Sequence, residues 1–316
     1  MTETRYVLLV THTRREEALS ATIEAAGDLV KAGLQPVMAE IERSDAISYA
    51  QGNPQQEEVL KHVLALGQDC TIEQLEIVMV LGGDGTILKA AELVRESQTP
   101  LLGINLGHVG FLAESEREGM ANAVQRIVER DYLVKERLTL DVSVIVDGAV
   151  IYQSWALNEA TVEKSAAEKM LEVVVEVDRR PLSSFGCDGV VMSTPTGSTA
   201  YAFSAGGPVV WPSVEALLLV PLSAHALFSR PLVISPNSML AVEVLQRSSG
   251  HGVLWCDGRR TQSLPPGARV EVRRSPKSVR LARLRQGPFT DRLVKKFSLP
   301  VSGWRGPDSA KQDSPE

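Results

Sequence analysis

The stretch IVMVLGGDGTILKAAELV, residues 77–94, runs from an apolar segment through two glycines, an aspartate and a third glycine into residues with helical spacing. It predicts a buried strand at 76–81 and a helix that begins near Thr86. A helix N-terminus offers unpaired amide groups and a partial positive charge, and glycines let a ligand approach the backbone closely. The stretch therefore predicts a strand, loop and helix that suit a bound phosphate.

Asp84 is the unusual residue of this loop. A carboxylate beside bound phosphates is repelled unless it holds a metal or accepts a proton from an attacking hydroxyl. The alternative is a tight turn, because Gly and Asp are both turn formers. The patterns GxxxxGK[ST] and GxGxxG of the common nucleotide loops are absent from the sequence, so the loop belongs to neither class.

The first third of the chain alternates between strand and helix patterns. This order predicts a parallel sheet with helices on its faces, and such sheets bind ligands at the carboxyl ends of their strands, where Asp84 would lie. The predicted elements are strands at 6–10, 35–41, 76–81 and 100–105, helices at 14–34 and 57–66, and a polar loop at 42–56.

After about residue 132 the apolar residues alternate with a period of two. Asp147–Gly148, flanked by alternating residues, predicts a hairpin within 138–157. The same period recurs at 171–185, 238–246, 252–260, 268–275 and 278–284. We therefore expect an α/β N-terminal domain (1–131) with a Rossmann-like parallel sheet, and a β-rich, sandwich-like domain (132–287). A helix at 288–299, with Thr290 as N-cap, is expected to return to the first domain, and 303–316 to be a disordered tail.

Composition excludes several classes of protein. The 316 residues allow about two domains, with 44% hydrophobic and 23% charged residues. A net charge of −6 argues against nucleic-acid binding, and no apolar run is long enough for a membrane helix. Three scattered cysteines without a CxxC pair indicate a reduced, cytoplasmic protein, and five histidines without metal-ligand spacing predict no tightly bound metal.

Three further stretches could carry chemistry. NLGHVGFL (105–112) follows an apolar strand, and taken alone it is more typical of a turn. FGCDGVVMSTPTGSTAYAFSAGG (185–207) gathers six Ser and Thr hydroxyls with glycines and Asp188, which suits a polar ligand with many hydroxyls such as a nucleotide. ALNEATVEK (156–164) places Asn158 and Glu159 at the end of an alternating strand, where an ordinary strand end is the alternative.

Taken in order, GGDGT, NxGxxGFL, Asn158–Glu159 and GVVMSTPTGSTAYAFSAGGP resemble the NAD kinase family over nearly the whole chain. ERLTL (136–140), CDGRR (256–260) and PFTDRLVKKF fit as well, although Cys187 precedes Asp188 where the family motif has glycine. GGDGT alone is weak, because diacylglycerol kinases, sphingosine kinases and phosphofructokinases have similar loops. TPTGSTAY behind Asn158–Glu159 is the specific part.

The resemblance implies a role for each matching residue. Asp84 is the expected proton acceptor, Gly85 lies in the dinucleotide site, and Lys89 is a basic residue at the nucleotide. Asn158 and Glu159 are expected to contact the ribose and nicotinamide of NAD. The remaining expected binding residues are Lys169, Asp188, Thr199, Ala200, Tyr201, Ala202, Phe203 and Ser204.

The implied activity is transfer of the γ-phosphoryl group of ATP to the 2′-hydroxyl of the adenosine ribose of NAD, giving NADP. Mg²⁺ or another divalent metal accompanies ATP, and a homo-oligomer is expected. The rivals are a diacylglycerol-type lipid kinase and a non-catalytic dinucleotide-binding regulator. The basic stretch 273–285 could be a polyanion site or a solvated strand face. The sequence is compatible with ATP or inorganic polyphosphate as donor, and with NADH as a second acceptor.

Overall fold

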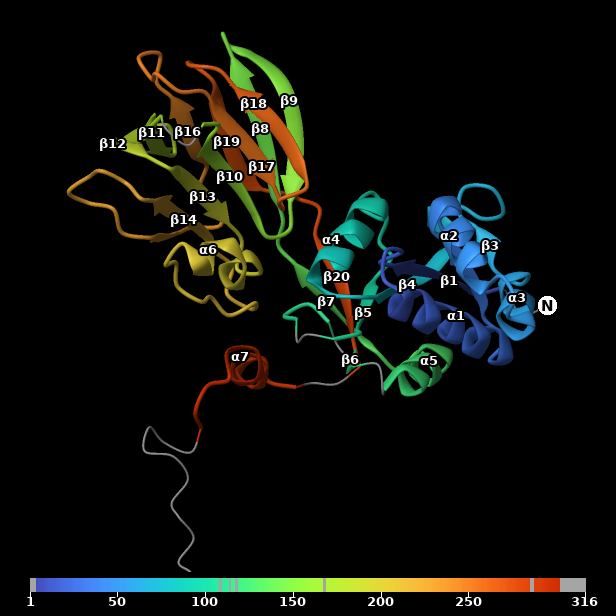
Figure 1. Ribbon diagram of the computed structural model, residues 1–316. Helices are drawn as coiled ribbons and strands as arrows, with labels where there is room; N and C mark the ends of the chain where they lie inside the picture. The colour runs from blue at the N-terminus through green and yellow to red at the C-terminus, as the bar shows by residue number, and fades with distance from the viewer. Residues whose placement is uncertain are drawn as a thin grey trace, which may run out of the picture. The chain divides into compact units, whose positions relative to one another are not determined.

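The computed structural model describes residues 4–107, 110–113, 115–116, 119–166, 169–284 and 287–301. They form two compact units (Figure 1), the first from segments within 1–87, 102–133 and 282–316, the second from 88–101 and 134–281. The predicted domain limits, 1–131 and 132–287, stay predictions, and the predicted tail at 303–316 lies outside the described residues. No helix in the described part of the chain is long and apolar enough to span a membrane.

An eight-stranded sheet has the order β3-β2-β1-β4-β5-β20-β7, with β6 paired to β5. The pairs β1–β2, β1–β4 and β2–β3 are parallel, which confirms the parallel sheet expected from the alternation of strands and helices. The strands are β1 (Tyr6–Thr11), β2 (Gln35–Met38), β3 (Leu64–Ala65), β4 (Leu75–Leu81), β5 (Leu101–Asn105), β6 (Ser115–Glu116), β7 (Leu133–Arg137) and β20 (Val279–Arg283).

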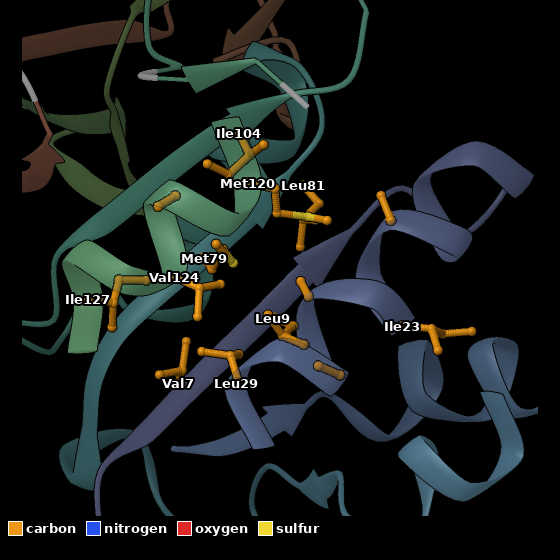
Figure 2. Close-up of a cluster of buried hydrophobic side chains, with 14 of the residues drawn as sticks. Val7, Leu9, Ile23, Leu29, Met79, Leu81, Ile104, Met120, Val124 and Ile127 are labelled. Carbon is orange, nitrogen blue, oxygen red and sulfur yellow. The ribbon is translucent and has the colours of Figure 1, made fainter. Parts of the chain in front are cut away.

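Helices α1 (Glu16–Lys31) and α5 (Met120–Val128) bury apolar faces against this sheet. Figure 2 shows Ile23 and Leu29 of α1, and Met120, Val124 and Ile127 of α5, in one cluster with strand side chains. The strand members labelled there are Val7, Leu9, Met79, Leu81 and Ile104. Burial of a side chain of this size contributes about 1.5–3 kcal/mol, so the cluster fixes the strands that precede the loops.

The predicted loop at 42–56 is wrong, because most of it is helical. Helix α2 spans Glu40–Ala50 and α3 spans Pro54–Leu60. The buried residues of α2 are Glu42, Ala46 and Ala50, at helical spacing but without an apolar stripe that a pattern search would find. The Glu42 carboxylate accepts the Thr11 backbone amide at 3.2 Å, which explains a buried acid in this helix.

The predicted helix at 57–66 is misplaced at both ends. Its N-cap is Asn53, whose side chain accepts the Gln56 amide, and Pro54 occupies the first turn. The helix ends at Leu60, and Leu64–Ala65 form β3. Of the apolar residues after Leu60, Leu64 and Ala65 form β3, which is too short to show a period of its own.

The second unit holds two antiparallel six-stranded sheets whose apolar residues share one core (Figure 1). This arrangement confirms the predicted sandwich-like β region. One sheet is β15 (Leu232–Ile234), β14 (Leu217–Leu222), β13 (Gly189–Ser193), β10 (Glu159–Lys164), β17 (Gly252–Cys256) and β18 (Arg260–Leu264). The other is β12 (Arg180–Cys187), β11 (Leu171–Val177), β16 (Leu240–Val244), β19 (Arg269–Arg274), β8 (Leu140–Val146) and β9 (Ala149–Ala156).

The hairpin predicted at Asp147–Gly148 is confirmed: these residues have φ of 50° and 77° and join the antiparallel strands β8 and β9. The prediction that 278–284 joins the antiparallel region is wrong, because β20 pairs in parallel with β5. The apolar residues of β20 alternate as those of the antiparallel strands do, and this alternation does not reveal which strand β20 pairs with. Helix α7 spans Phe289–Phe297 with Pro288 as N-cap, so the predicted N-cap Thr290 lies inside the helix.

Candidate active site

Asp84 is the first residue of α4 (Asp84–Leu93). The helix begins two residues before the predicted start at Thr86, because the amides of Thr86 and Ile87 already donate to the Gly83 carbonyl at 2.9 and 3.2 Å. Strand β4 ends at Leu81, so the glycines between them turn the chain from strand to helix. The GGDGT stretch is therefore a strand, loop and helix N-terminus, as predicted.

The carboxylate of Asp84 is held by the loop that contains NLGHVGFL. The Phe111 amide donates to Oδ2 and the Leu112 amide donates to Oδ1, each at 3.1 Å. A Cβ on Gly110 would clash with Oδ1 and lie 3.0 Å from Cγ of Asp84, so only glycine allows this approach. His108 and Val109 of the same motif lie outside the described residues. The motif therefore binds the carboxylate rather than serving as an ordinary turn.

The two other predicted residues of this stretch, Gly85 and Lys89, lie at different places on α4. Gly85 is exposed beside Asp84 at the helix N-terminus. Lys89 is partly buried and lies five residues after Asp84 on α4. At 3.6 residues per turn, Lys89 projects roughly 140° around the helix from Asp84, so the two side chains leave different faces of α4.

In the second unit, Asn158 and Glu159 lie where the chain enters β10, and Asp257 holds their backbone. The carboxylate of Asp257 accepts the amides of Leu157 (2.9 Å), Asn158 (2.7 Å) and Glu159 (3.3 Å). In return the Asp257 amide donates to the Glu159 carbonyl at 2.9 Å. Asp257 is a functional residue without a predicted role, although it is the aspartate of the CDGRR stretch.

Arg260 connects Asp257 to α4 within the second unit. Its guanidinium donates to Asp257 at 2.8 Å, to Glu92 at 2.6 Å and to the Trp155 carbonyl at 2.9 Å. It also stacks over the Trp155 ring, 4.6 Å from the centroid, and Arg259 pairs with Glu92 at 3.0 Å. The Asn158–Glu159 backbone is thus held by a connected set of charges, in which the buried Asp257 has a cationic partner.

Glu159 is buried, and its Oε2 has no hydrogen-bond partner among the described residues. Burial, with the nearby Asp257 carboxylate as the second cause, raises the pKa of Glu159 to about 8, although the Tyr201 amide donates to it and opposes the shift. Burial also raises the pKa of Asp257, against its three amide donors and Arg260. At neutral pH Glu159 is therefore largely protonated, and can both donate and accept a hydrogen bond.

The hydroxyl-rich segment is partly structural, which corrects the interpretation that its hydroxyls face a ligand. Ser193, Thr194 and Ser198 are buried. Their hydroxyls donate to the carbonyls of Asn158 (3.0 Å), Leu157 (2.6 Å) and Pro195 (2.7 Å), respectively. These hydroxyls fold the loop onto the Asn158–Glu159 backbone, and composition alone could not distinguish them from hydroxyls that face outwards.

The predicted segment Thr199–Ser204 covers the end of a 3₁₀ turn (Gly197–Thr199) and the short helix α6 (Tyr201–Ser204). Tyr201, Phe203 and Ser204 are exposed, and Thr199 and Ala200 are partly exposed. Ala202 is buried against Val191 and Val220, so its side chain anchors the segment. A Cβ on Gly197 would clash with the Asn158 carbonyl oxygen, which explains the glycine in this turn.

The two remaining predicted residues lie apart from this group of backbone contacts. Asp188 is partly exposed and pairs with Lys164 at 2.6 Å. That hydrogen bond, followed by one from Ser223, lowers the pKa of Asp188. Lys169 is exposed, and two residues of the SAAEK segment, 167 and 168, lie outside the described residues.

Two further features of the described residues concern the reactivity of the cysteines and the presence of metal ligands. Burial raises the pKa of Cys187 to about 12 and that of Cys256 to about 11, so neither thiol is a nucleophile at neutral pH. Across the described ranges, no group of three or more His, Cys, Asp or Glu side chains could hold a metal ion.

The structure brings the predicted residues together within each unit. Asp84 and Gly85 belong to the first unit, with the loop at 110–112. Asn158, Glu159 and Tyr201 are joined in the second, where burial, followed by the carboxylates of Glu163, Asp188 and Glu159, raises the pKa of Tyr201.

This pair of units has the fold of NADH and NAD kinases. Yeast NADH kinase, solved in complex with NADH, aligns with a TM-score of 0.85 over 96% of this chain and 90% of that chain, at 21% identity. An NAD kinase from Archaeoglobus fulgidus, solved in complex with ATP, aligns with a TM-score of 0.67 over 94% of this chain and 100% of that chain, at 22% identity.

The chain belongs to the ATP-NAD kinase family. The family models for the ATP-NAD kinase N-terminal and C-terminal domains match residues 7–132 and 157–284. An NAD kinase of Leifsonia xyli subsp. xyli is 63% identical, with 98% of this chain and 99% of that protein covered. An NAD kinase of Thermobifida fusca is 56% identical, over 99% and 95%. The resemblance noted in the sequence is confirmed.

Proposed function

We propose that this chain transfers the γ-phosphoryl group of ATP to the 2′-hydroxyl of the adenosine ribose of NAD, giving NADP. Membership of the ATP-NAD kinase family makes it an NAD kinase. The observation that carries the residue-level proposal is the position of Asp84, at the N-terminus of α4 with its two oxygens held by separate amides.

Asp84 accepts the proton of the attacking hydroxyl in this proposal. A ribose hydroxyl is a weak nucleophile until its proton is accepted, and a carboxylate at hydrogen-bond distance can do so. Each carboxylate oxygen can accept a second hydrogen bond besides its amide, so the Phe111 and Leu112 amides orient Asp84 without blocking it. The N-terminus of α4, with Gly85 and Lys89, binds phosphate oxygens.

NAD binds to residues of the second unit in this proposal. The unpartnered Oε2 of the buried Glu159 supports a ligand hydrogen bond, because a buried polar atom without a partner costs about 1–3 kcal/mol. Asn158 lies beside it on a backbone that Asp257 and the Ser193–Thr194 loop hold in place. Lys169, Asp188 and the segment Thr199–Ser204 complete the binding surface.

The divalent metal arrives with ATP. Mg²⁺ usually keeps several waters and binds through one or two carboxylates plus substrate phosphates, rather than in a cage of protein ligands. The loop at the N-terminus of α4 fits this mode, because it would bind the phosphates that carry the metal while Asp84 accepts the substrate proton. The metal would neutralise charge on the transferred phosphoryl group.

The two rivals fit less well. A diacylglycerol-type kinase shares GGDGT, but relatives that are 56–63% identical over nearly the whole chain are named NAD kinases. A non-catalytic regulator has no need of a carboxylate oriented by two amides.

Two expectations concern the cellular form of the protein. We propose a homo-oligomer, supported by Leu227, Phe228 and Val233, which are large apolar side chains exposed on the second unit. We also propose a cytoplasmic location, supported by three cysteines that are all free and buried. Light scattering of the wild type and of Phe228→Ser would test the first.

The proposal is tested by incubating the purified chain with NAD, ATP and MgCl₂ and measuring NADP with an NADP-specific dehydrogenase. Parallel reactions replace NAD with NADH or with diacylglycerol in mixed micelles, and ATP with polyphosphate. Asp84→Asn is the matched control for contaminating kinase. NADP formation by the wild type alone supports the proposal; phosphorylated lipid without NADP would overturn it, and NAD binding without turnover would favour the regulator.

A further inference from the structure

Helix α7, the red helix in Figure 1, supports the loop that holds Asp84. Nη1 of Arg292 donates to the carbonyl oxygens of Phe111 (3.0 Å) and Ala113 (3.2 Å). The Phe111 ring lies against Phe289 and Phe297 of the same helix, with ring centroids 6.0 and 5.6 Å apart. These contacts all lie within the first unit.

One peptide group joins Arg292 to Asp84. The Phe111 carbonyl, which accepts from Arg292, and the Leu112 amide, which donates to Asp84, belong to the same planar peptide unit. In a trans peptide these two groups point in opposite directions, so a donor on the carbonyl fixes the direction of the amide. A cationic donor on the carbonyl also strengthens the hydrogen bond that the amide makes.

The Phe111 contacts fix the second amide. The amide of Phe111 donates to Oδ2 of Asp84, while its ring is placed by the two phenylalanines of α7. Movement of α7 would therefore shift both donors on the carboxylate together. Glycine at 110 leaves Asp84 in close contact with the loop, so a small displacement of the loop reaches the carboxylate.

We propose that Arg292 is a positioning residue: through the Phe111–Leu112 peptide, it holds the Asp84 carboxylate in the orientation that accepts the substrate proton. The inference rests on the proposed role of Asp84. It concerns a helix outside both segments matched by the family models, 7–132 and 157–284.

The variant Arg292→Gln should lower kcat by about ten- to a hundredfold, because small misplacements of reacting groups cost up to that much. KM for NAD should change by less than about threefold, since Arg292 is proposed to act on Asp84 and not on NAD binding. Arg292→Lys should retain most of the activity, because Nη1 alone makes both hydrogen bonds and one ammonium can replace it. Lys31→Gln, which removes an exposed cation that pairs with Asp28 on α1 of the same unit, should leave kcat unchanged.

Two measurements separate positioning from general stability. Amide hydrogen exchange at Phe111 and Leu112 should be faster in Arg292→Gln, and exchange in β1 and β4 should not. In an Asp84→Asn background, adding Arg292→Gln should cost no further turnover.

Each outcome decides a different point. Unchanged exchange at Phe111 and Leu112, or an equal loss of kcat in both backgrounds, would overturn the role of Arg292. Normal turnover in Asp84→Asn would instead overturn the proposed role of Asp84, and the exchange measurement would still show whether Arg292 orders the loop.

Discussion

The carboxylate of Asp257 accepts the backbone amide of Asn158 at 2.7 Å, across 99 residues of sequence. The same carboxylate accepts the amides on either side of Asn158, at 2.9 and 3.3 Å, and pairs with Arg260 at 2.8 Å. Asp257 itself turns the chain between β17 and β18 with φ of 54°. A hairpin residue thus fixes the backbone of both predicted NAD ligands.

Asp257→Asn should destabilise the protein by about 2–4 kcal/mol, because one carboxamide oxygen cannot replace a carboxylate shared by three amides and Arg260. NAD affinity should fall as well, since the Asn158–Glu159 backbone loses its anchor. The measurement is thermal unfolding with calorimetric NAD binding.

Asp178→Asn provides the matched control. Asp178 also has a positive φ of 52° in a hairpin and accepts the Met239 amide at 2.9 Å, but it is exposed. Its replacement should cost about 1 kcal/mol or less and leave NAD affinity intact. Equal losses of stability and of NAD affinity in Asp257→Asn and Asp178→Asn would show that the hydrogen bonds around Asp257 contribute nothing beyond those of an ordinary hairpin residue.

Local signals predicted most of the fold. The Asp147–Gly148 turn and the alternation of strands and helices depend on neighbouring residues, and the structure contains both. The α2 helix was missed because its buried face consists of Glu42, Ala46 and Ala50, which carry no apolar period. The predicted position of 278–284 was wrong because its partner, β5, lies far away in sequence.

In the candidate site too, local patterns reveal some features and long-range contacts determine the others. Asp84, Asn158 and Glu159 stand in recognisable motifs, and so do Phe111, Leu112 and Asp257, which hold them. Which motif contacts which is not visible in the sequence. Arg260 reaches Glu92 across 168 residues, and Arg292 reaches Phe111 across 181. Contacts of this kind leave no trace in local spacing. The burial of Ser193 and Thr194 is likewise a property of the folded loop. Composition alone led to the wrong prediction that their hydroxyls face a ligand.

Glu159→Gln should change how stability depends on pH. The folded-state pKa of Glu159, about 8, lies above the ordinary value of 4.5, so between these values the folded chain keeps a proton that the unfolded chain has released. The contribution of Glu159 is therefore fully present below pH 4.5 and is lost as pH rises through the folded pKa, by up to about 1.4 kcal/mol per pH unit. The free energy of unfolding of Glu159→Gln, relative to wild type, should rise between pH 5 and 8.

Urea titrations at a series of pH values measure this difference. Parallel curves for the two proteins over that range would show that Glu159 is ionised in the folded state, so that it could only accept a hydrogen bond from a ligand.

Lys89→Ala should lower kcat/KM for ATP by about tenfold or more, the worth of a charge-assisted hydrogen bond to phosphate. KM for NAD should change less. Lys61→Ala removes a cation that pairs with Glu58 on an exposed surface, and should leave both constants unchanged. Because Lys89 leaves α4 on a different face from Asp84, normal ATP kinetics in Lys89→Ala would identify its role as helix packing.

Asp84→Asn is the most direct test of the mechanism. The change keeps the size of the side chain and one of its two acceptor oxygens, but removes the proton acceptor. If Asp84 is the general base, turnover should fall by about a hundred- to ten-thousandfold, or roughly 3–5 kcal/mol of transition-state stabilisation. NAD affinity should change far less, because Asn can still hydrogen-bond to the ribose hydroxyl.

Three roles of Asp84 predict three different results. A turn former predicts nearly normal turnover in Asp84→Asn, since Asn is also a good turn residue and one carboxamide oxygen can still accept from Phe111 or Leu112. A metal ligand predicts partial recovery as Mg²⁺ is raised, because weaker binding is offset by concentration. A general base predicts a loss of turnover that Mg²⁺ does not restore. Steady-state turnover titrated with Mg²⁺, together with calorimetric NAD binding, distinguishes them, and a turnover close to wild type would rule out proton acceptance by Asp84.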